Sequence, residues 1–228
     1  MNPVKPGETP RTPWIVGVSG ASGTPYAAAV LRGLLDAGES VDLVVSRASR
    51  LTLLDETGIS FRDAHWQDDL REWLARGADG KPGTFQPDIA AVRHWSAGDL
   101  AAGPSSGSYP AKGMLIVPAS TACVAGVALG LSKDLLQRAA SVTLKERRRL
   151  VVSVRETPLN GQTLRHLVTL DDLGAAVVPA SPGFYAGATH IQDLVDFVAG
   201  RVLDAAGVEH DLYRRWKGDL GGPRTTDN

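Results

Sequence analysis

Short apolar runs alternate with segments of helical periodicity along most of this chain, and this alternation constrains the fold more than any other feature. The apolar runs are residues 14–18, 41–45, 114–117, 150–154 and 175–178, and the helical segments between and after them include 27–35, 48–56, 132–145, 161–172 and 191–206. Strand-helix-strand order is typical of βαβ units, which build a parallel sheet. We therefore predict an α/β fold with a three-layer, Rossmann-like parallel sheet and helices on both of its faces.

The length and composition favour a single folded unit. The chain has 228 residues, of which 43% are apolar and 21% charged, with a formal net charge of -1. Domains commonly span roughly 100–200 residues. We predict a disordered leader over residues 1–12, which holds three prolines, one domain over 13–207 and a C-terminal arm over 208–228. Leu212, Tyr213 and Trp216 lie among charges in that arm and predict that it docks on another surface, such as a neighbouring subunit.

Several partners and compartments are disfavoured by the same sequence. The densest basic run, residues 145–149, is better interpreted as a charged helix end than as a nucleic-acid groove. Cys123 is the only cysteine, which excludes an intramolecular disulfide and a cysteine-rich metal site and suits a reducing cytoplasm. No stretch approaches the roughly 18 apolar residues that a membrane span needs. We expect a cytoplasmic protein with no nucleic-acid or membrane partner.

A glycine-rich turn follows the first apolar run and opens a helix. Its residues Gly20, Ala21 and Ser22 would let backbone N–H groups approach a phosphate near a helix N-terminus. An ordinary tight turn between strand and helix would look the same. Dinucleotide sites place an acidic residue after the second strand, whereas this chain has Ser46 and Arg47 there. The pattern therefore favours a mononucleotide over a dinucleotide.

A second junction of small residues follows the run 114–117. Ser120, Thr121, Ala122 and Cys123 stand where a flat ring could lie against the backbone. Two such junctions on one edge of a parallel sheet form a plausible cofactor crevice. The alternative is that Ser120 only caps the next helix, and that Cys123 only fills space in its first turn.

Two cations in one helical segment and one in the last helix are candidates for binding an anion. Arg138 and Lys145 lie seven residues apart, on one helix face that borders the apolar stripe. Arg201 stands at the edge of the apolar face of segment 191–206. Because an unpaired buried charge costs several kcal/mol, Arg201 needs an anionic partner, which is either Asp204 or a ligand phosphate.

Two further segments end near the same predicted edge of the sheet. Arg155 and Glu156 directly follow a buried strand, where they could act on a ligand or simply pair with each other. Tyr185, in the loop after the run 175–178, could cover a ring, donate to a phosphate or pack as part of a lid.

Taken together, these segments resemble the flavin prenyltransferases, the UbiX-like flavoproteins. The matching runs are VSGASG at 18–23, SGSY at 106–109, GLSKDLLQRAASVTLKERRR at 130–149, VRETPL at 154–159, PASPGFY at 179–185 and DLVDFVAGRVL at 193–203. LKERR, RETPL and PGFY in this order are highly specific, and the runs span nearly all of residues 14–207.

The resemblance implies a flavoprotein-type fold and a metal-independent transfer reaction. Reduced FMN and dimethylallyl phosphate would be joined through flavin N5 and C6, which builds a fourth ring. The product, prenylated FMN, would pass to a separate UbiD-like decarboxylase. The resemblance also implies a large homo-oligomer, a dodecamer, with sites at subunit boundaries.

Site residues carry over by position. The resemblance implies that FMN is held by Gly20, Ala21, Ser22, Ser46, Ser120, Thr121, Ala122, Cys123 and Arg138. Lys145, Arg155, Tyr185 and Arg201 would grip the prenyl phosphate. The implied catalytic set is Lys145, Ser22, Glu156 as acid or base, Glu56 for flavin N5 protons and Tyr109, whose ring would shield an allylic cation.

One departure and two rival functions accompany this interpretation. The family usually has Ser-Met-Lys-Thr where this chain has Ser-Thr-Ala-Cys at 120–123, so a lysine is missing beside the flavin. An FMN-dependent cysteine-type decarboxylase shares the fold but relies on an active-site histidine, and no histidine follows the second strand here. A non-catalytic FMN-binding accessory subunit would not need Lys145, Glu156 and Arg201.

Overall fold

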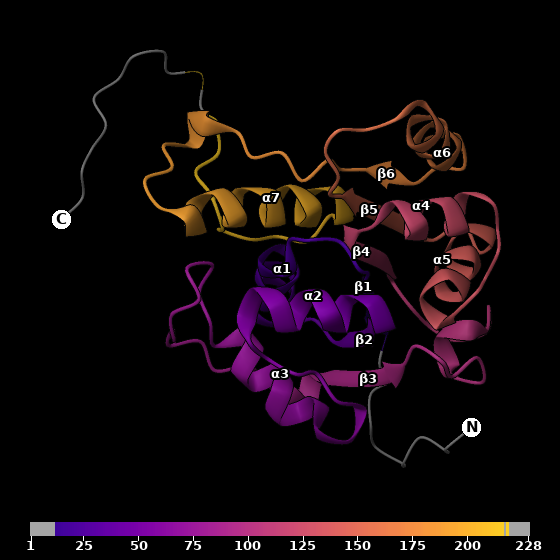
Figure 1. Cartoon of the computed structure of the whole chain (residues 1–228), viewed down its shortest axis with the longest axis horizontal. Helices are drawn as coiled ribbons and strands as arrows, with labels where there is room; N and C mark the ends of the chain where they lie inside the picture. Colours follow the sequence, from indigo (N-terminus) through magenta and orange to yellow (C-terminus); the bar gives the residue numbers. More distant parts are fainter. Residues whose placement is uncertain (1–11, 217, 219–228) are drawn as a thin grey trace.

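The computed structural model describes residues 12–216 and 218, and they form one parallel sheet between two layers of helices (Figure 1). The strand order is β3-β2-β1-β4-β5-β6, and every pairing is parallel. The strands are β1 (Trp14–Val18), β2 (Val41–Val45), β3 (Val92–Ser96), β4 (Gly113–Ala119), β5 (Arg149–Val154) and β6 (Ala176–Val177). The predicted fold class is confirmed.

In the described part of the chain, seven α-helices connect or cover these strands. They are α1 (Thr24–Asp36), α2 (Arg47–Thr57), α3 (Trp66–Leu74), α4 (Thr121–Ala128), α5 (Leu135–Lys145), α6 (Gly161–Asp172) and α7 (Ile191–Ala206). Four short 3₁₀ turns are η1 (Asp63–His65), η2 (Ile89–Ala91), η3 (Gly103–Ser105) and η4 (Phe184–Ala186).

Each face of the sheet buries its own apolar core, which explains the continuous apolar runs of the central strands. In β1, Val16 and Val18 pack against the side covered by α1, α2, α3 and α7. Ile15 packs against the side covered by α4, α5 and α6. Because the strand order reverses between β1 and β4, the C-terminal ends of these two strands flank the crevice where such sheets bind ligands.

Two elements of the structure were not predicted from the sequence. Strand β3 lies at the edge of the sheet and is fully buried only at Val92, so it has no continuous apolar run. Helix α3 does carry a periodic signal, because Leu70, Trp73 and Leu74 are buried on one face. With β3 present, the junction at Ser120 follows the fourth strand of the chain and not the third.

Several boundaries differ from their predicted positions by one to three residues. The helix expected from residue 132 begins at Leu135, because the side chain of Asp134 accepts a hydrogen bond from Gln137 N and caps it. The last strand is two residues long, Ala176–Val177. Helices α6 and α7 begin and end where they were predicted.

Only parts of the predicted leader and of the predicted C-terminal arm belong to the described residues. Residues 1–11 of the predicted leader, residue 217 and residues 219–228 of the predicted arm lie outside the described residues. The described part of the arm docks on helix α7 of its own chain, where Tyr213 packs on Phe197 with ring centroids 5.0 Å apart. No helix among the described residues is long and apolar enough to cross a membrane. The proposed domain boundaries stay predictions.

Candidate active site

A buried serine joins the turns after β1 and β4. The Ser19 hydroxyl donates to the carbonyl oxygen of Pro118 over 2.8 Å and accepts from the backbone N–H of Ser120 over 2.7 Å. Ser19 N also donates to Pro118 O over 3.2 Å. The two turns that were expected to bind the flavin are therefore fixed to each other, and their relative position does not depend on a ligand.

The N-terminus of α1 is occupied by a carboxylate of the protein itself. Glu56, near the end of α2, accepts from Gly23 N over 2.9 Å, from Thr24 N over 2.8 Å and from the Thr24 hydroxyl over 2.6 Å. Burial alone would raise the pKa of Glu56, but hydrogen bonds from Ser22, Thr24 and Gly23 lower it below its ordinary value. A phosphate at this helix end would have to displace Glu56. The amides of Gly23 and Thr24 are therefore engaged by the protein itself, and a phosphate contact at Gly20, Ala21 and Ser22 stays a prediction.

The N-terminus of α4 is more open. Ser120 caps it by accepting from Cys123 N over 3.3 Å, as predicted. The amides of Thr121 and Ala122 precede the first intrahelical hydrogen bond, so they are available to an electron-rich edge of a ligand. Cys123 is buried, and burial raises the pKa of its thiol to about 12. This thiol therefore remains protonated and packs as a small apolar side chain.

The turn after β2 lies directly beside the turn after β1. Ser46 N donates to Val18 O over 3.0 Å, and the Ser46 hydroxyl caps α2 by accepting from Ser49 N over 3.1 Å. A Cβ atom added to Gly20 would lie 2.5 Å from the Cβ of Ala48. Only glycine allows the first turn and α2 to approach this closely.

Arg155 directly follows β5, and its side chain reaches the turn after β1. Its Nε donates to the backbone oxygen of Ser22 over 2.9 Å, and its backbone N–H donates to Ala119 O over 3.3 Å. Glu156 is exposed, and its carboxylate accepts from Thr157 N over 3.0 Å. The expected alternative, an ion pair between Arg155 and Glu156, is absent from the described contacts.

A second group of predicted residues gathers around α5 and the loop before β4. Arg138 Nε donates to Ser105 O over 3.0 Å, and Lys145 forms an ion pair with Glu146 against Gly107. The hydroxyl of Tyr109 donates to the Asp42 carboxylate over 2.6 Å. Asp42 is the second residue of β2, so within one chain Tyr109 lies away from the strand ends that were expected to hold the flavin.

A third group lies beside the edge strand β6 and helix α7. Tyr185 packs edge-on against Phe197 and against Trp216 of the arm, with ring centroids 5.4 and 6.0 Å apart. Arg201 lines a cavity of about 460 Å³ together with Val177, Val178, Pro179, Ser181, Phe197, Asp204 and Ala205. The anionic partner predicted for Arg201 is Asp204, at 2.7 Å.

One chain alone does not bring all of the expected phosphate-binding cations together. Lys145 ends α5, which packs on one face of the sheet, whereas Arg201 belongs to α7, which packs on the other. Arg155 lies with the turns after β1 and β4. The expected cluster of Lys145, Tyr185 and Arg201 is therefore not assembled within a single subunit.

Sequence reasoning overlooked Ser19 and underestimated the C-terminal arm. The available signal for Ser19 was its position between a buried strand and the glycine of the turn. For the arm, the signal was a tyrosine and an arginine, Tyr213 and Arg215, which lie 9 and 11 residues after the acceptor Asp204.

The residues at the strand ends fit a flavin. Gly20, Ala21 and Ala122 bring no bulky side chain to these turns, and the amides at the start of α4 can donate to the oxygens or nitrogens of a flat ring. Among the described residues, no group of three or more His, Cys, Asp or Glu side chains is arranged to hold a metal ion. None of the five histidines lies on the turn after β1, β2 or β4.

This fold and this pair of joined turns define a flavoprotein, and the family model described as Flavoprotein matches residues 4–203. A flavin prenyltransferase UbiX of Streptomyces coelicolor is 90% identical over 214 residues, which cover 94% of this chain and 99% of that protein. The chain belongs to the flavin prenyltransferase family.

Solved structures agree with this assignment. A crystal structure of AnUbiX (PadA1) in complex with FMN and dimethylallyl pyrophosphate has a TM-score of 0.77 at 33% identity, covering 92% of this chain and 100% of that one. A dodecameric FMN-dependent UbiX-like decarboxylase from Escherichia coli O157:H7 also has a TM-score of 0.77, at 34% identity, covering 91% of this chain and 100% of that one.

Proposed function

We propose that this chain joins the dimethylallyl group of dimethylallyl phosphate to N5 and C6 of reduced FMN and releases prenylated FMN. Family membership together with the turns held by Ser19 carries this proposal, because they supply a preformed edge for a flat flavin. FMN is a substrate in this reaction, and its ring supplies the two nucleophilic atoms.

The side chains would act mainly on the departing phosphate. When the allylic C–O bond breaks, the phosphate leaves with the electron pair and gains negative charge. Lys145, Arg155 and Arg201, with the Tyr185 hydroxyl, would stabilise this charge more in the transition state than in the ground state. N5 loses its proton as the N5–C bond forms, and the alkene of the attached prenyl group takes up a proton before C6 attacks it. Glu156 would accept the C6 proton that ring closure releases. Tyr109 would shield the allylic cation through its ring.

Assembly of this site requires more than one copy of the chain. Since Lys145 and Arg201 lie on opposite faces of one sheet, a single phosphate can meet both only if they come from different subunits. We propose a homo-oligomer, a dodecamer, with the active site at a subunit boundary. The dodecameric structural neighbour supports this proposal.

The missing family lysine and the roles of Glu56 and Ser22 belong to the flavin side of the site. The backbone N–H groups of Thr121 and Ala122 do not replace the charge and the hydrogen bonds of the missing lysine side chain. The affinity for the flavin or the flavin redox potential should therefore differ from that of relatives with Ser-Met-Lys-Thr. Glu56, held as a carboxylate at α1, would accept and not donate a proton near flavin N5.

We also propose a recipient and a location. Prenylated FMN would be delivered to a UbiD-like decarboxylase, so this protein would supply a cofactor and would not itself decarboxylate a substrate. A reducing compartment such as the cytoplasm suits a chain whose single thiol is buried and protonated.

Anaerobic incubation with reduced FMN and dimethylallyl phosphate tests the reaction. The flavin recovered after incubation should be heavier by one prenyl group, as measured by mass spectrometry. Arg201→Ala should lose turnover and retain FMN. A flavin of unchanged mass would instead identify an accessory FMN-binding protein, and loss of FMN from the Arg201 variant would contradict the assignment of Arg201 to the phosphate.

A further inference from the structure

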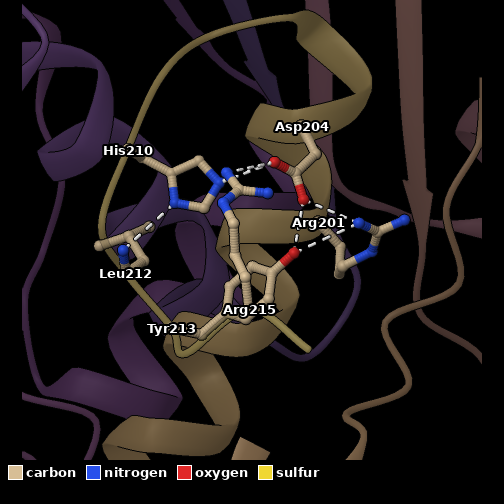
Figure 2. Close-up of polar contacts among 6 residues, drawn as sticks. All are labelled: Arg201, Asp204, His210, Leu212, Tyr213 and Arg215. Atoms are coloured by element: carbon tan, nitrogen blue, oxygen red, sulfur yellow. Dashed lines mark hydrogen bonds and ion pairs between the residues drawn. The ribbon is translucent and has the colours of Figure 1, made fainter. Parts of the chain in front are cut away.

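One carboxylate on the last helix receives hydrogen bonds from four side chains. Asp204 Oδ2 accepts from Arg201 Nη1 over 2.7 Å and from the Tyr213 hydroxyl over 2.5 Å (Figure 2). Asp204 Oδ1 accepts from Arg215 Nη2 over 2.8 Å and from His210 Nε2 over 3.1 Å. Three of these four donors come from the arm that follows α7.

The arm is fitted to α7 and is not loosely laid on it. His210 is almost fully buried, with 3% of its side chain exposed. A Cβ atom added to Gly200 would lie 2.5 Å from the Tyr213 ring and 2.7 Å from the His210 ring, so this glycine makes room for the arm. Leu212 packs against the apolar core on the face of the sheet that α1 and α7 cover. The position of Tyr213 is therefore determined by packing, and the Arg215 guanidinium lies over its ring, with Cζ 5.6 Å from the ring centroid.

The hydrogen bonds also fix which nitrogen of His210 carries the proton. Leu212 N donates to His210 Nδ1 over 3.2 Å, so Nδ1 is an acceptor and the proton lies on Nε2, which donates to Asp204. Tyr213 contacts Arg201 as well, with its oxygen 3.3 Å from Nη1. Arg201 is thus held by two oxygens, one of the carboxylate and one of the phenol.

The Asp204 cluster holds two guanidinium groups and one carboxylate, so it keeps a net positive charge that can attract an anion. Asp204 faces two guanidinium groups, those of Arg201 and Arg215, so the one negative charge is shared between two positive ones. If Arg215 were absent, Asp204 would neutralise Arg201 more completely and weaken its attraction for an anion. Arg201 and Asp204 both line the 460 Å³ cavity beside β6, whereas Arg215 reaches Asp204 from its other oxygen.

We propose that Tyr213 and Arg215 are positioning residues for the transfer reaction, which act through Asp204 to orient Arg201 and to preserve its charge for the prenyl phosphate. This inference rests on the proposed function, in which Arg201 binds that phosphate. The arm thereby becomes part of the substrate site without touching the substrate.

Steady-state kinetics of the full-length chain with reduced FMN and dimethylallyl phosphate test the inference. Tyr213→Phe keeps the packed ring and removes the hydroxyl, and Arg215→Gln removes the second positive charge. Each should raise KM for dimethylallyl phosphate by roughly five- to tenfold with little change in kcat, which is the size of a typical net hydrogen-bond contribution. FMN affinity, measured by fluorescence titration, should stay within twofold. Arg214→Gln, which removes a neighbouring charge outside the Asp204 cluster, is the matched control.

A double-mutant cycle separates this role from a merely structural one. In an Asp204→Asn background, Arg215→Gln should no longer raise KM, because the charge that Arg215 offsets is gone. An equal effect of Arg215→Gln in both backgrounds would overturn the inference. So would KM values within twofold of the parent for Tyr213→Phe and Arg215→Gln while Arg201→Ala loses substrate binding. If Arg201→Ala itself leaves KM unchanged, the phosphate role in the proposed function is wrong.

Discussion

Glu56 shows at the scale of one residue how this chain uses a helix end. A carboxylate at a helix N-terminus satisfies backbone N–H groups that lack intrahelical partners and interacts favourably with the helix dipole. Here the carboxylate comes from the far end of another helix and joins α2 to α1. The contact spans 32 residues of sequence, so no local pattern could have predicted it.

Replacing Glu56 should destabilise the fold in a pH-dependent manner. Glu56→Gln should lower the free energy of unfolding at pH 7 by roughly 1–3 kcal/mol, because charged hydrogen bonds are lost. The pKa of Glu56 is lowered in the folded state, so its contribution is complete above the unfolded pKa of about 4.3 and is lost as pH falls through the folded pKa. Urea denaturation between pH 7 and 3 should show the two proteins converging in acid.

Asp55→Asn, at the exposed neighbouring position, controls for the loss of a charge from α2. It should leave stability almost unchanged over the same pH range. A constant difference between Glu56→Gln and the parent protein down to pH 3 would contradict the role given to the Glu56 carboxylate.

Single residues were predicted best where their requirement was local. Ser120 was expected to cap a helix and does so. Arg201 was expected to need an anion, and the sequence offered Asp204 or a phosphate; the structure shows Asp204 in one chain. The contact between Tyr109 and Asp42 was not predicted, because the two residues are 67 positions apart and Asp42 belongs to a strand, while the role of Tyr109 in the reaction stays a prediction.

At the scale of elements, the first turn and α2 pack too closely to tolerate a side chain at Gly20. Gly20→Ala would place a Cβ 2.5 Å from the Cβ of Ala48 and 3.1 Å from its carbonyl carbon. We expect α2 to shift and the free energy of unfolding to fall by roughly 1–3 kcal/mol, the usual cost of overpacking. Chemical denaturation measures the change.

A compensating substitution tests this interpretation. Combining Gly20→Ala with Ala48→Gly removes the main clash, so the double variant should lose less stability than the sum of the two single variants. Gly98→Ala is a suitable control, because nothing lies within 4 Å of the Cβ that it would add. Additive losses would mean that the two positions do not compete for space.

Strands that are buried on both faces were predicted more accurately than the partly exposed edge strand. Central strands β1, β2, β4 and β5 are buried on both faces and gave continuous apolar runs that marked them closely. Edge strand β3 lacks such a run because water and loops cover much of it, and Arg93 and His94 interrupt its sequence. Helix α3 was not predicted although its period was present, because Gly58 before it and the glycines and prolines of residues 77–87 after it are typical of loops.

At the scale of the whole molecule, the sheet separates the cations that one phosphate should meet. Lys145 and Arg201 belong to helices on opposite faces, so the sheet lies between these helices in one chain. The sequence indicated each residue but could not show this separation, because it depends on which face each helix covers.

Activity should therefore depend on assembly. Light scattering of the purified protein should give a mass several times the 24.0 kDa of one chain. Dilution or mutation that yields folded monomers, verified by circular dichroism, should abolish prenyl transfer. A fully active monomer would show that one chain is sufficient and would contradict the proposed shared site.

The docked arm has a practical consequence for anyone who handles this enzyme. An affinity tag, fluorophore or immobilisation linker attached close behind Trp216 would pull on the same few residues that hold the Asp204 cluster. Such labels should change the apparent KM for dimethylallyl phosphate, although the protein would still bind FMN and would look pure.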